Sequence, residues 1–154
     1  MPRQRRAGLL AILRRLLLGL VVASLAAVLC LRWLPPPTSA FMIERQLGNF
    51  FSSRRAPPLH YRWLPWEALP KSMALAVIAA EDQKFPHHLG FDIDSILKAA
   101  ETNTAERVRG ASTISQQVAK NLFLWPGRSY LRKGLEVYFT LLIELSWPKQ
   151  RILG

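Results

Sequence analysis

The sequence lacks several features on which common kinds of protein site depend. It contains a single cysteine, Cys30, so the chain can form no internal disulfide. Cys30 lies in an apolar run, and no cluster of cysteine and histidine has the spacing of metal ligands. These absences exclude a disulfide framework and a zinc site built from cysteine and histidine.

Acidic residues are also scarce, and they are unevenly distributed. The 154 residues include 21 Lys and Arg but only 10 Asp and Glu, which gives a formal net charge of +11. Residues 1–15 hold five arginines and no acid, whereas residues 35–154 hold 15 basic and 10 acidic side chains. The mild excess in residues 35–154 suits an anionic partner such as a membrane surface or a phosphate group, and it is too diffuse to indicate nucleic acid.

One long apolar run is present. Residues 16–31 carry no charge, and at about 1.5 Å per residue they would span roughly 24 Å as a helix, somewhat less than a bilayer core. Because flanking arginines can snorkel and Trp33 can lie at the interface, we expect a transmembrane anchor over residues 16–34 behind a basic cytoplasmic tail at residues 1–15. The alternative is a secretory signal cleaved after Ala40. In both cases the positive-inside rule predicts that the part of the chain beyond the apolar run is exported.

Residues 35–69 are expected to form a linker and membrane-proximal segment. The prolines at 35–37 cannot continue a helix and predict a stiff stalk. Between residues 41 and 66, six aromatic side chains are interleaved with four arginines. This mixture suits a bilayer interface, and it equally suits ordinary packing of a connecting segment.

Beyond Pro70 the pattern predicts a mainly α exported domain, because no stretch alternates with period two. The apolar run 73–80 predicts a buried helix that ends at Glu81 and Asp82. A second helix is predicted from Asp92 or Asp94, with an inner face formed by Ile93, Ile96, Leu97 and Ala100. Two more are predicted over 113–123 and about 130–145, the latter with a shared face of Leu131, Leu135, Tyr138, Phe139 and Leu142.

Glu81 is the first residue that suggests chemistry. It opens the stretch EDQKFPHHLGFD, with Asp82 beside it. Burial disfavours the charged form of a carboxylate and a neighbouring negative charge acts in the same direction, so the pKa of Glu81 is expected to rise toward the neutral range. A plain solvated acid at a helix end is the alternative on local grounds.

The second cluster is GASTISQQVAKNLFLW, residues 110–125. Ser112, Gln116 and Lys120 fall at i, i+4 and i+8. The opposite apolar stripe consists of Ile114, Val118 and Leu122. We interpret one side as facing the core and the other as suited to a phosphate or a sugar, with an ordinary solvated helix face as the alternative.

The third cluster lies on the last predicted helix. Arg132 and Glu136 would form an i, i+4 surface ion pair, but base before acid is the weaker order, and Arg132 and Lys133 occupy the first turn, where the dipole prefers anions. Cations beside free backbone N–H groups make a good anion site, and a diphosphate would fit.

Together the three clusters resemble the motifs of glycosyltransferase family 51, which includes monofunctional biosynthetic peptidoglycan transglycosylases. EDQKFPHHLGFD is similar to the family's first motif, GASTISQQVAKNLFL to its second and RKGLE to its third, in the same order over residues 70–154. The resemblance implies a lysozyme-like α fold. It also implies inverting polymerisation of peptidoglycan glycan chains from a lipid-linked disaccharide-peptide precursor (lipid II), on the outer side of the inner membrane, with release of lipid diphosphate.

The resemblance also implies roles for single residues. Glu81 would be the general base, and Glu136 would assist departure of the donor by organising a divalent cation such as Mg or Mn or neighbouring groups. Lys120, Arg132 and Lys133 would neutralise the diphosphate, and no organic cofactor is implied. The other residues expected to bind substrate or shape its site are Asp82, Phe85, His88, Gly90, Ser112, Thr113, Gln116, Gln117 and Asn121.

The family pattern continues past WPKQRILG with a further acidic motif, so we expect residues 70–154 to be the N-terminal part of the domain in a C-terminally truncated chain. The expected partners are lipid II, the growing glycan strand, the membrane and cell-wall synthesis or division proteins, without nucleic acid. Three alternatives are a lytic enzyme of similar fold, the front part of a bifunctional penicillin-binding protein, and a non-catalytic membrane tether in cell-wall synthesis.

Overall fold

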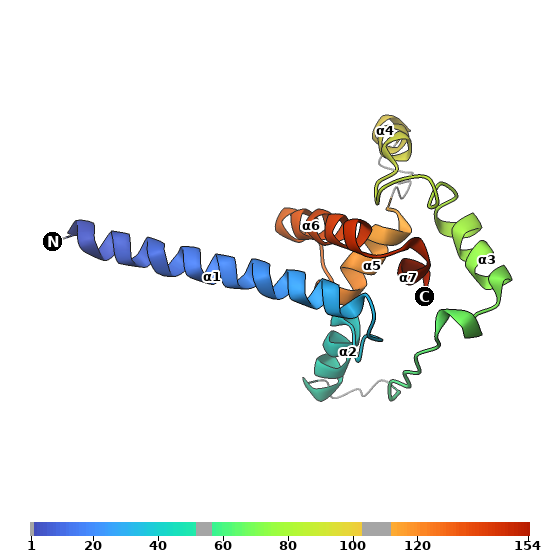
Figure 1. Cartoon of the computed structure of the whole chain (residues 1–154), viewed down its shortest axis with the longest axis horizontal. Coiled ribbons are helices and arrows are strands. Elements are labelled where there is room, and N and C mark those ends of the chain that lie inside the picture. The colour runs from blue at the N-terminus through green and yellow to red at the C-terminus, as the bar shows by residue number, and fades with distance from the viewer. Residues whose placement is uncertain (1, 52–56, 103–111) are drawn as a thin grey trace. The chain divides into compact units, whose positions relative to one another are not determined.

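The computed structural model describes residues 2–51, 57–102 and 112–154 (Figure 1). Every regular element in these ranges is a helix, which confirms the predicted mainly α class. The elements are α1 (Pro2–Leu31), α2 (Ala40–Phe51), the 3-10 helix η1 (Trp66–Ala68), α3 (Lys71–Glu81), α4 (Ile93–Thr102), α5 (Ile114–Phe123), α6 (Tyr130–Ser146) and α7 (Lys149–Leu153). The chain divides into two compact units, Met1–Leu34 and Pro35–Gly154.

The first unit is one long helix. Within α1, the 24 residues Gly8–Leu31 are long and apolar enough to cross a membrane. At about 1.5 Å per residue such a stretch spans about 36 Å, which is long enough for a bilayer core, whereas residues 16–31 alone would be too short. The helix continues through Arg14 and Arg15 because arginine favours helix formation.

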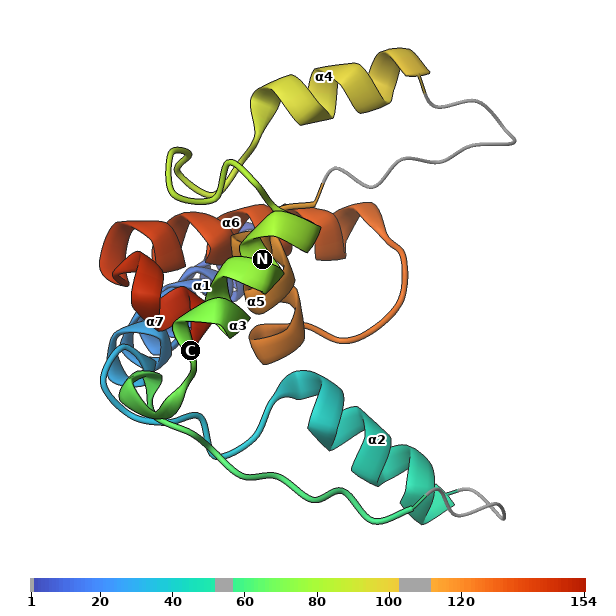
Figure 2. The same cartoon turned by 90° about the vertical axis from the view of Figure 1, so that its right-hand side faces the viewer.

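The centre of the second unit is formed by α5 and α6, which pack against each other and cross at an angle (Figure 2). Near the start of α5 the Ser115 hydroxyl donates to the carboxylate of Glu144 near the end of α6. At the other end Phe123 stacks on Phe139 with ring centroids 4.5 Å apart. Buried apolar side chains in and next to α5, α6 and α7 are Ile114, Ala119, Leu124, Ile143, Trp147 and Ile152. This pair is the frame that positions the candidate site.

Local caps fix the starts of three helices, which begin where the sequence predicts. Thr113 Oγ1 accepts the backbone N–H of Gln116 at 3.3 Å, and the Gln116 side chain accepts the N–H of Thr113 at 3.0 Å, which completes a capping box. Ser129 caps α6 and Asp92 caps the start of α4, each by accepting an N–H three residues on. The predicted helix starts at these positions are confirmed.

The predicted burial of two helices is wrong. No residue of α3 is buried, and Met73 and Leu75 are 56% and 65% exposed. On α4, Ile93, Ile96 and Leu97 are exposed; the side chain of Ala100 lies outside what the structure describes. α4 lies at the edge of the unit in both views (Figures 1 and 2), and α3 lies at its edge in Figure 1. Periodicity predicts which residues share a face, and it does not predict whether another layer covers that face.

The buried side of α6 also differs from the prediction. Its buried residues are Glu136, Thr140 and Ile143, whereas Leu131 is 70% exposed. Two polar residues are tolerated inside because both are paired. The Thr140 hydroxyl donates to the Glu136 carbonyl at 2.7 Å, and the Glu136 carboxylate is held by two cations. A polar group on this inner side was not expected from the apolar pattern.

Candidate active site

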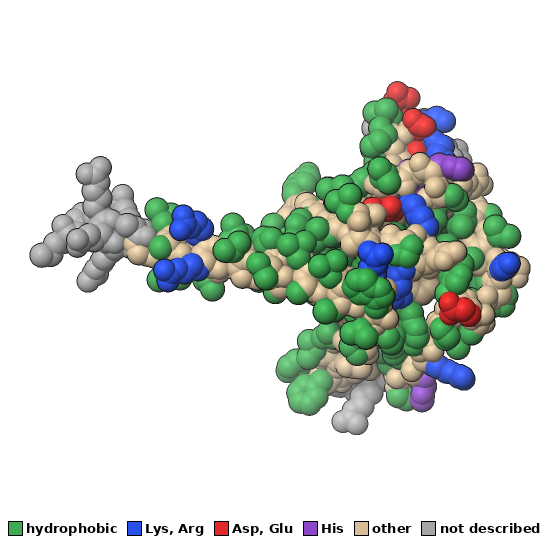
Figure 3. Space-filling model, in the orientation of Figure 1, with side chains coloured by type: hydrophobic (Ala, Val, Ile, Leu, Met, Phe, Trp, Pro, Cys, Tyr) green, Lys and Arg blue, Asp and Glu red, His purple; other side chains and the backbone are tan. Residues whose placement is uncertain are grey.

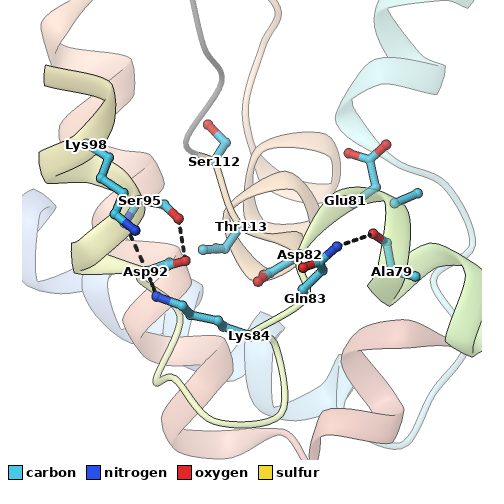
Figure 4. A pocket seen from close by; sticks show the side chains of 11 residues that line it. Ala79, Glu81, Asp82, Gln83, Lys84, Asp92, Ser95, Lys98, Ser112 and Thr113 are labelled. Carbon is cyan, nitrogen blue, oxygen red and sulfur yellow. Dashed lines mark hydrogen bonds and ion pairs between the residues drawn. The ribbon is translucent and has the colours of Figure 1, made fainter. Parts of the chain in front are cut away.

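A cavity of about 440 Å³ opens where the end of α3 meets the starts of α4 and α5 (Figure 4). Its lining residues are Ala79, Ala80, Glu81, Asp82, Gln83, Lys84, Asp92, Ser95, Lys98, Ser112 and Thr113. The fold therefore brings the first two predicted clusters to one pocket, although they lie some thirty residues apart in the sequence. We call this cavity the Glu81 pocket.

Glu81 is the last residue of α3 and its side chain is exposed. The expected desolvation of this carboxylate is therefore wrong, because the apolar helix before it is itself exposed. Gln117 on α5 donates its Nε2–H to Glu81 Oε2 at 2.9 Å. This hydrogen bond orients the carboxylate without neutralising it, so that it can still accept a proton from a hydroxyl group bound in the pocket.

The neighbouring Asp82 holds the end of α3 against α5. It is buried, and its Oδ2 accepts the backbone N–H of Ile114, the first residue of α5, at 3.0 Å. A carboxylate is favoured there because a helix N-terminus presents free N–H groups and a positive dipole end. Asp82 thereby fixes the position of Glu81 relative to Gln117, and it also lines the Glu81 pocket.

His88 completes this connection as a neutral ring. The Gly90 N–H donates to His88 Nδ1 at 3.1 Å, so Nδ1 must be unprotonated. The ring hydrogen is then on Nε2, which lies 2.9 Å from Asp82 Oδ2 and donates to that carboxylate. One ring nitrogen of His88 thus binds the backbone of the first motif at Gly90, and the other binds Asp82.

Gly90 lies at a position that only glycine fits. Its φ is +85°, and an added Cβ would lie 2.8 Å from side-chain carbons of both Thr140 and Glu144 on α6. Its carbonyl accepts the Thr113 hydroxyl at 2.6 Å. The first motif therefore packs directly on the α5–α6 pair at this residue.

Gly90→Ala is expected to lower the free energy of unfolding by roughly 1–3 kcal/mol, because the new methyl group meets strained backbone and a closely packed wall. Urea unfolding in detergent micelles, followed by circular dichroism, measures the change. The matched control is Gly134→Ala on α6, where an added Cβ meets nothing within 4 Å and alanine favours the helix by up to about 1 kcal/mol. Equal stability of the two variants would contradict the prediction.

An ion pair between the partly exposed Lys149 of α7 and the buried Glu144 carboxylate of α6 supports the first motif. Lys149 Nζ donates to both carboxylate oxygens of Glu144 at 2.9 Å and to the His88 carbonyl at 2.7 Å. The same ammonium lies 4.4 Å from the ring centroid of Phe85, which is buried. The Glu144 side chain is only 4% exposed, and it also accepts the Ser115 hydroxyl. Sequence reasoning missed this group, since Lys149 and His88 are 61 residues apart and no local pattern links them.

The opposite wall of the Glu81 pocket is held by Lys84. Its Nζ lies 3.2 Å from Asp92 Oδ1 and 2.7 Å from Asp94 Oδ2. The Ser95 hydroxyl, assisted by Lys84, lowers the pKa of Asp92 to about 2. Hydrogen bonds to Asp94 and Asp92 raise the pKa of Lys84. Figure 4 shows Lys84 and Ser95 both directed at Asp92 at the start of α4.

The lowered pKa of Asp92 predicts an acid-sensitive start of α4. A carboxylate with a folded pKa of about 2, against an ordinary 3.8, contributes stability that is fully present above the ordinary value and is lost as the pH falls through the folded value. The urea midpoint of the wild-type protein should fall between pH 4 and about pH 2, and Asp92→Asn should show a weaker acid dependence over that window. Parallel pH profiles of the two proteins would contradict this assignment.

Lys120 and Asn121 lie further along α5, outside the Glu81 pocket. Lys120 Nζ lies 5.7 Å from the ring centroid of Phe41 on α2. Asn121 lines a second cavity of about 730 Å³, most of whose walls come from α2. Both residues follow Gln117 at i+3 and i+4, so one side of α5 runs from the Glu81 pocket to this second cavity.

The third cluster is a buried carboxylate between two cations. The Glu136 side chain is 3% exposed, and it accepts hydrogen bonds from Arg132 Nη1 at 2.8 Å and from Lys133 Nζ. Arg132 is itself 11% exposed, whereas Lys133 is 48% exposed and remains able to meet an anion. The Arg132–Glu136 ion pair, which was expected at the surface, is thus buried.

These surroundings do not fit a divalent cation at Glu136. Each of its carboxylate oxygens already faces a positively charged group, and a bound cation would be repelled by both. Within the described ranges, no three acidic, histidine or cysteine side chains gather as a possible metal site. A role for Glu136 in holding Arg132 and Lys133 in place is the better description.

Five of the residues expected to bind substrate or shape its site are buried: Asp82, Phe85, Gly90, Thr113 and Gln116. Asp82 and Thr113 still line the Glu81 pocket, whereas Phe85, Gly90 and Gln116 do not. Gln116 is turned inward by its capping box, and Ser112 precedes the helix, so the predicted stripe of Ser112, Gln116 and Lys120 does not form one side of α5. The residue that reaches Glu81 is the next one along, Gln117.

The helical frame and the three clusters define the class of protein, and the comparisons with known proteins agree. The chain belongs to the transglycosylase family: residues 48–154 match the family model described as Transglycosylase. The predicted lysozyme-like helical domain is confirmed by this match. The match begins within α2, and so includes part of the segment that the sequence pattern assigns to a linker.

Several curated relatives are named biosynthetic peptidoglycan transglycosylase. The protein of that name from Stutzerimonas stutzeri (strain A1501) is 56% identical over 147 residues, which are 95% of this chain and 60% of the relative. The one from Ectopseudomonas mendocina (strain ymp) is 55% identical over 142 residues, 92% of this chain and 58% of the relative. The one from Pseudomonas entomophila (strain L48) is 53% identical over 147 residues, 95% and 62%. The chain spans about three fifths of the length of these relatives.

Proposed function

We propose that the protein polymerises peptidoglycan glycan chains from a lipid-linked disaccharide-peptide precursor and releases lipid diphosphate. The observation that carries this proposal is the exposed Glu81 carboxylate in its pocket, oriented by Gln117 and fixed by Asp82 to the start of α5. Family membership and the names of the relatives support it.

In the proposed reaction Glu81 acts as general base. It takes the proton of the acceptor sugar hydroxyl while that oxygen attacks the anomeric carbon of the donor glycan. The bond from this carbon to the diphosphate oxygen breaks, so the anomeric centre is inverted and the lipid diphosphate leaves with the bonding electron pair. A positioned base contributes typically about 10²–10⁴-fold to such a step.

The leaving diphosphate needs positive charge that is already in place when the bond breaks. Lys120 on α5 and the half-exposed Lys133 at the first turn of α6 supply it. Glu136 keeps the ammonium of Lys133 and the guanidinium of Arg132 at fixed positions. Preorganised charge of this kind stabilises the transition state, because no reorganisation is needed during the reaction.

We also propose that α1 crosses the inner membrane once, with its arginine-rich start in the cytoplasm and the second unit on the outer side. The three arginines before Gly8 favour this orientation by the positive-inside rule, and Arg14 and Arg15, inside the apolar stretch, can snorkel toward the same side. The Glu81 pocket then meets the lipid-linked sugar substrate on the outer side of the membrane.

The experiment is a reconstitution with the lipid-linked precursor. Purified protein in detergent or liposomes should convert the precursor to polymer, resolved on gels, and release one lipid diphosphate for each disaccharide added. Cleavage of preformed glycan without polymer formation would replace the proposal by a lytic enzyme. Neither polymer nor cleavage, from a protein that is folded and membrane-bound, would favour a non-catalytic tether.

A further inference from the structure

Lys120 on α5 is held by an aromatic ring, whereas other lysines of the same unit are held by carboxylates. Its Nζ lies 5.7 Å from the ring centroid of Phe41 on α2, within the roughly 6 Å over which the face of an aromatic ring attracts a cation. Lys84, Lys133 and Lys149 each form an ion pair with an acidic side chain. None of the acidic side chains that the structure describes forms an ion pair with Lys120.

A neutral partner suits an ammonium that has to meet an anion. A carboxylate fixes a lysine but offsets its charge, as Glu136 does for Lys133. The face of an aromatic ring carries only a quadrupole, so it attracts the ammonium and leaves its full positive charge available to an incoming anion. Because Lys120 is half-buried, water and salt screen this charge less than they would screen that of a fully exposed lysine.

The start of α2 holds the Phe41 ring in place. Ser39 caps this first turn by accepting the Met42 N–H at 3.2 Å. α2 packs against α5, and Phe41 and Met42 are half-buried, whereas Phe50 and Phe51 at the other end of α2 are exposed. Figure 3 shows hydrophobic side chains gathered over α2. The ring that meets Lys120 is thus part of the packed structure before any ligand binds.

The Lys120 ammonium lies close to both cavities along α5. Asn121, the next residue, lines the second cavity together with Phe41. Gln117, which donates to the Glu81 carboxylate, lies about one turn before Lys120, or roughly 5 Å along the helix axis. An anion bound at Lys120 would therefore lie near the carboxylate proposed to act as the base.

We propose that Phe41 is a positioning residue for the Lys120 ammonium, which it holds toward the diphosphate of the lipid-linked precursor without neutralising it. The inference rests on the proposed function, since it concerns the diphosphate whose charge Lys120 is proposed to neutralise. It makes α2, which contains none of the three clusters, part of the site. Loss of one such contact at a partly exposed position should weaken binding of a diphosphate by about two- to fivefold.

The first test follows the Lys120 ammonium itself, in the full chain in detergent micelles. Isotope-labelled formaldehyde converts the lysines to dimethylamines, which keep their charge, and the Lys120 signal in the nuclear magnetic resonance spectrum is identified by its absence in Lys120→Arg. Phe41→Leu removes the ring but keeps an apolar side chain, Phe41→Tyr keeps the ring, and Met42→Leu is the matched control in the same turn.

The ring current should shift the Lys120 methyl signal upfield in the wild type, in Phe41→Tyr and in Met42→Leu, and this shift should be lost in Phe41→Leu. The same signal in Phe41→Leu as in the wild type would overturn the proposal. Because this measurement needs neither substrate nor turnover, it decides on the contact whether or not the chain polymerises glycan.

Titration with inorganic pyrophosphate measures what the contact does. The Lys120 signal should respond to pyrophosphate in the wild type, and the apparent Kd should rise by about two- to fivefold in Phe41→Leu. Phe41→Tyr and Met42→Leu should keep the wild-type Kd. A Lys120 signal that does not respond to pyrophosphate, or an unchanged Kd in Phe41→Leu, would contradict the proposal.

The precursor assay separates positioning from packing. Phe41→Leu should lower kcat/KM for the lipid-linked precursor by about two- to fivefold, and it should cause no further loss when Lys120 is already replaced by Met, because only the ammonium links Phe41 to the diphosphate. Equal losses with and without Lys120 would assign Phe41 to packing and overturn the proposal. Pyrophosphate binding as expected, in a protein that forms no polymer, would contradict the proposed function while supporting the role of Phe41 at Lys120.

Discussion

Glu81→Gln is expected to lower the rate of glycan polymerisation by about 10²–10⁴-fold, the usual contribution of a general base. The amide has nearly the same shape as the carboxylate and can still meet the Gln117 side chain, but it cannot take the proton of an acceptor hydroxyl. Because Glu81 is exposed and makes no buried ion pair, the substitution should leave folding and binding of the lipid-linked precursor largely unchanged. The initial rate of precursor consumption measures the effect.

The matched control is Glu67→Gln, at an exposed acid of η1 that does not line the Glu81 pocket. This variant should polymerise at the wild-type rate. If Glu81→Gln also retained the wild-type rate, Glu81 would have no part in the chemistry and the proposed mechanism would fail. An equal loss of rate and of thermal stability would instead point to a structural effect.

The ends of the helices could be predicted because they are set by neighbouring residues. Thr113 and Gln116 form their capping box within four residues, and Ser129 and Asp92 act in the same way. Such hydrogen bonds need no information from elsewhere in the chain. For this reason α5 and α6 begin where the sequence predicts.

Which sides of these helices are buried could not be predicted from the same patterns. Met73, Leu75 and Ile93 are apolar at helical spacing, yet all three are exposed, while Glu136 is buried between two cations. Burial depends on which distant elements cover a face, and the charge of Glu136 is tolerated only because its partners lie one turn away on the same helix.

The residues of the candidate site could largely be predicted, whereas their contacts could not. The motif pattern singles out Glu81 and Gln117, but only the fold shows that they meet across 36 residues. The pattern also places Gln116 on the binding side, where the capping box turns it inward. Glu144 and Lys149 belong to no predicted site, since Lys149 contacts His88 across 61 residues.

These missed residues matter because the Glu81 pocket rests on them. From Lys149 the contacts run through the His88 carbonyl to the ring that donates to Asp82, and from Asp82 to the first N–H of α5. Glu81 is adjacent to Asp82 and has no comparable anchor of its own among the described residues. The position of Glu81 is thus set indirectly, by the contacts that Lys149 and His88 make with the rest of the first motif.

Lys149→Met is accordingly expected to destabilise the protein strongly. Breaking a buried ion pair by removing one partner costs roughly 3–5 kcal/mol, because the other charge stays buried. The Lys149 side chain is 30% exposed while that of Glu144 is 4% exposed, so we expect the lower end of this range and a fall in melting temperature of roughly 10–15 °C for a unit of this size. Thermal unfolding in detergent, followed by circular dichroism, measures the fall, with the exposed Lys71→Met as the control.

The double variant Glu144→Gln/Lys149→Met separates the ion pair from simple loss of packing. If the cost of Lys149→Met comes from the uncompensated Glu144 carboxylate, then removing that charge should restore part of the lost stability, with a coupling energy of roughly 1–3 kcal/mol in the double-mutant cycle. Additive losses would mean that Lys149 acts through its contacts with Phe85 and the His88 carbonyl alone. Lys149→Arg keeps the charge but replaces a point ammonium by a planar fork, so it should lie between the wild type and Lys149→Met.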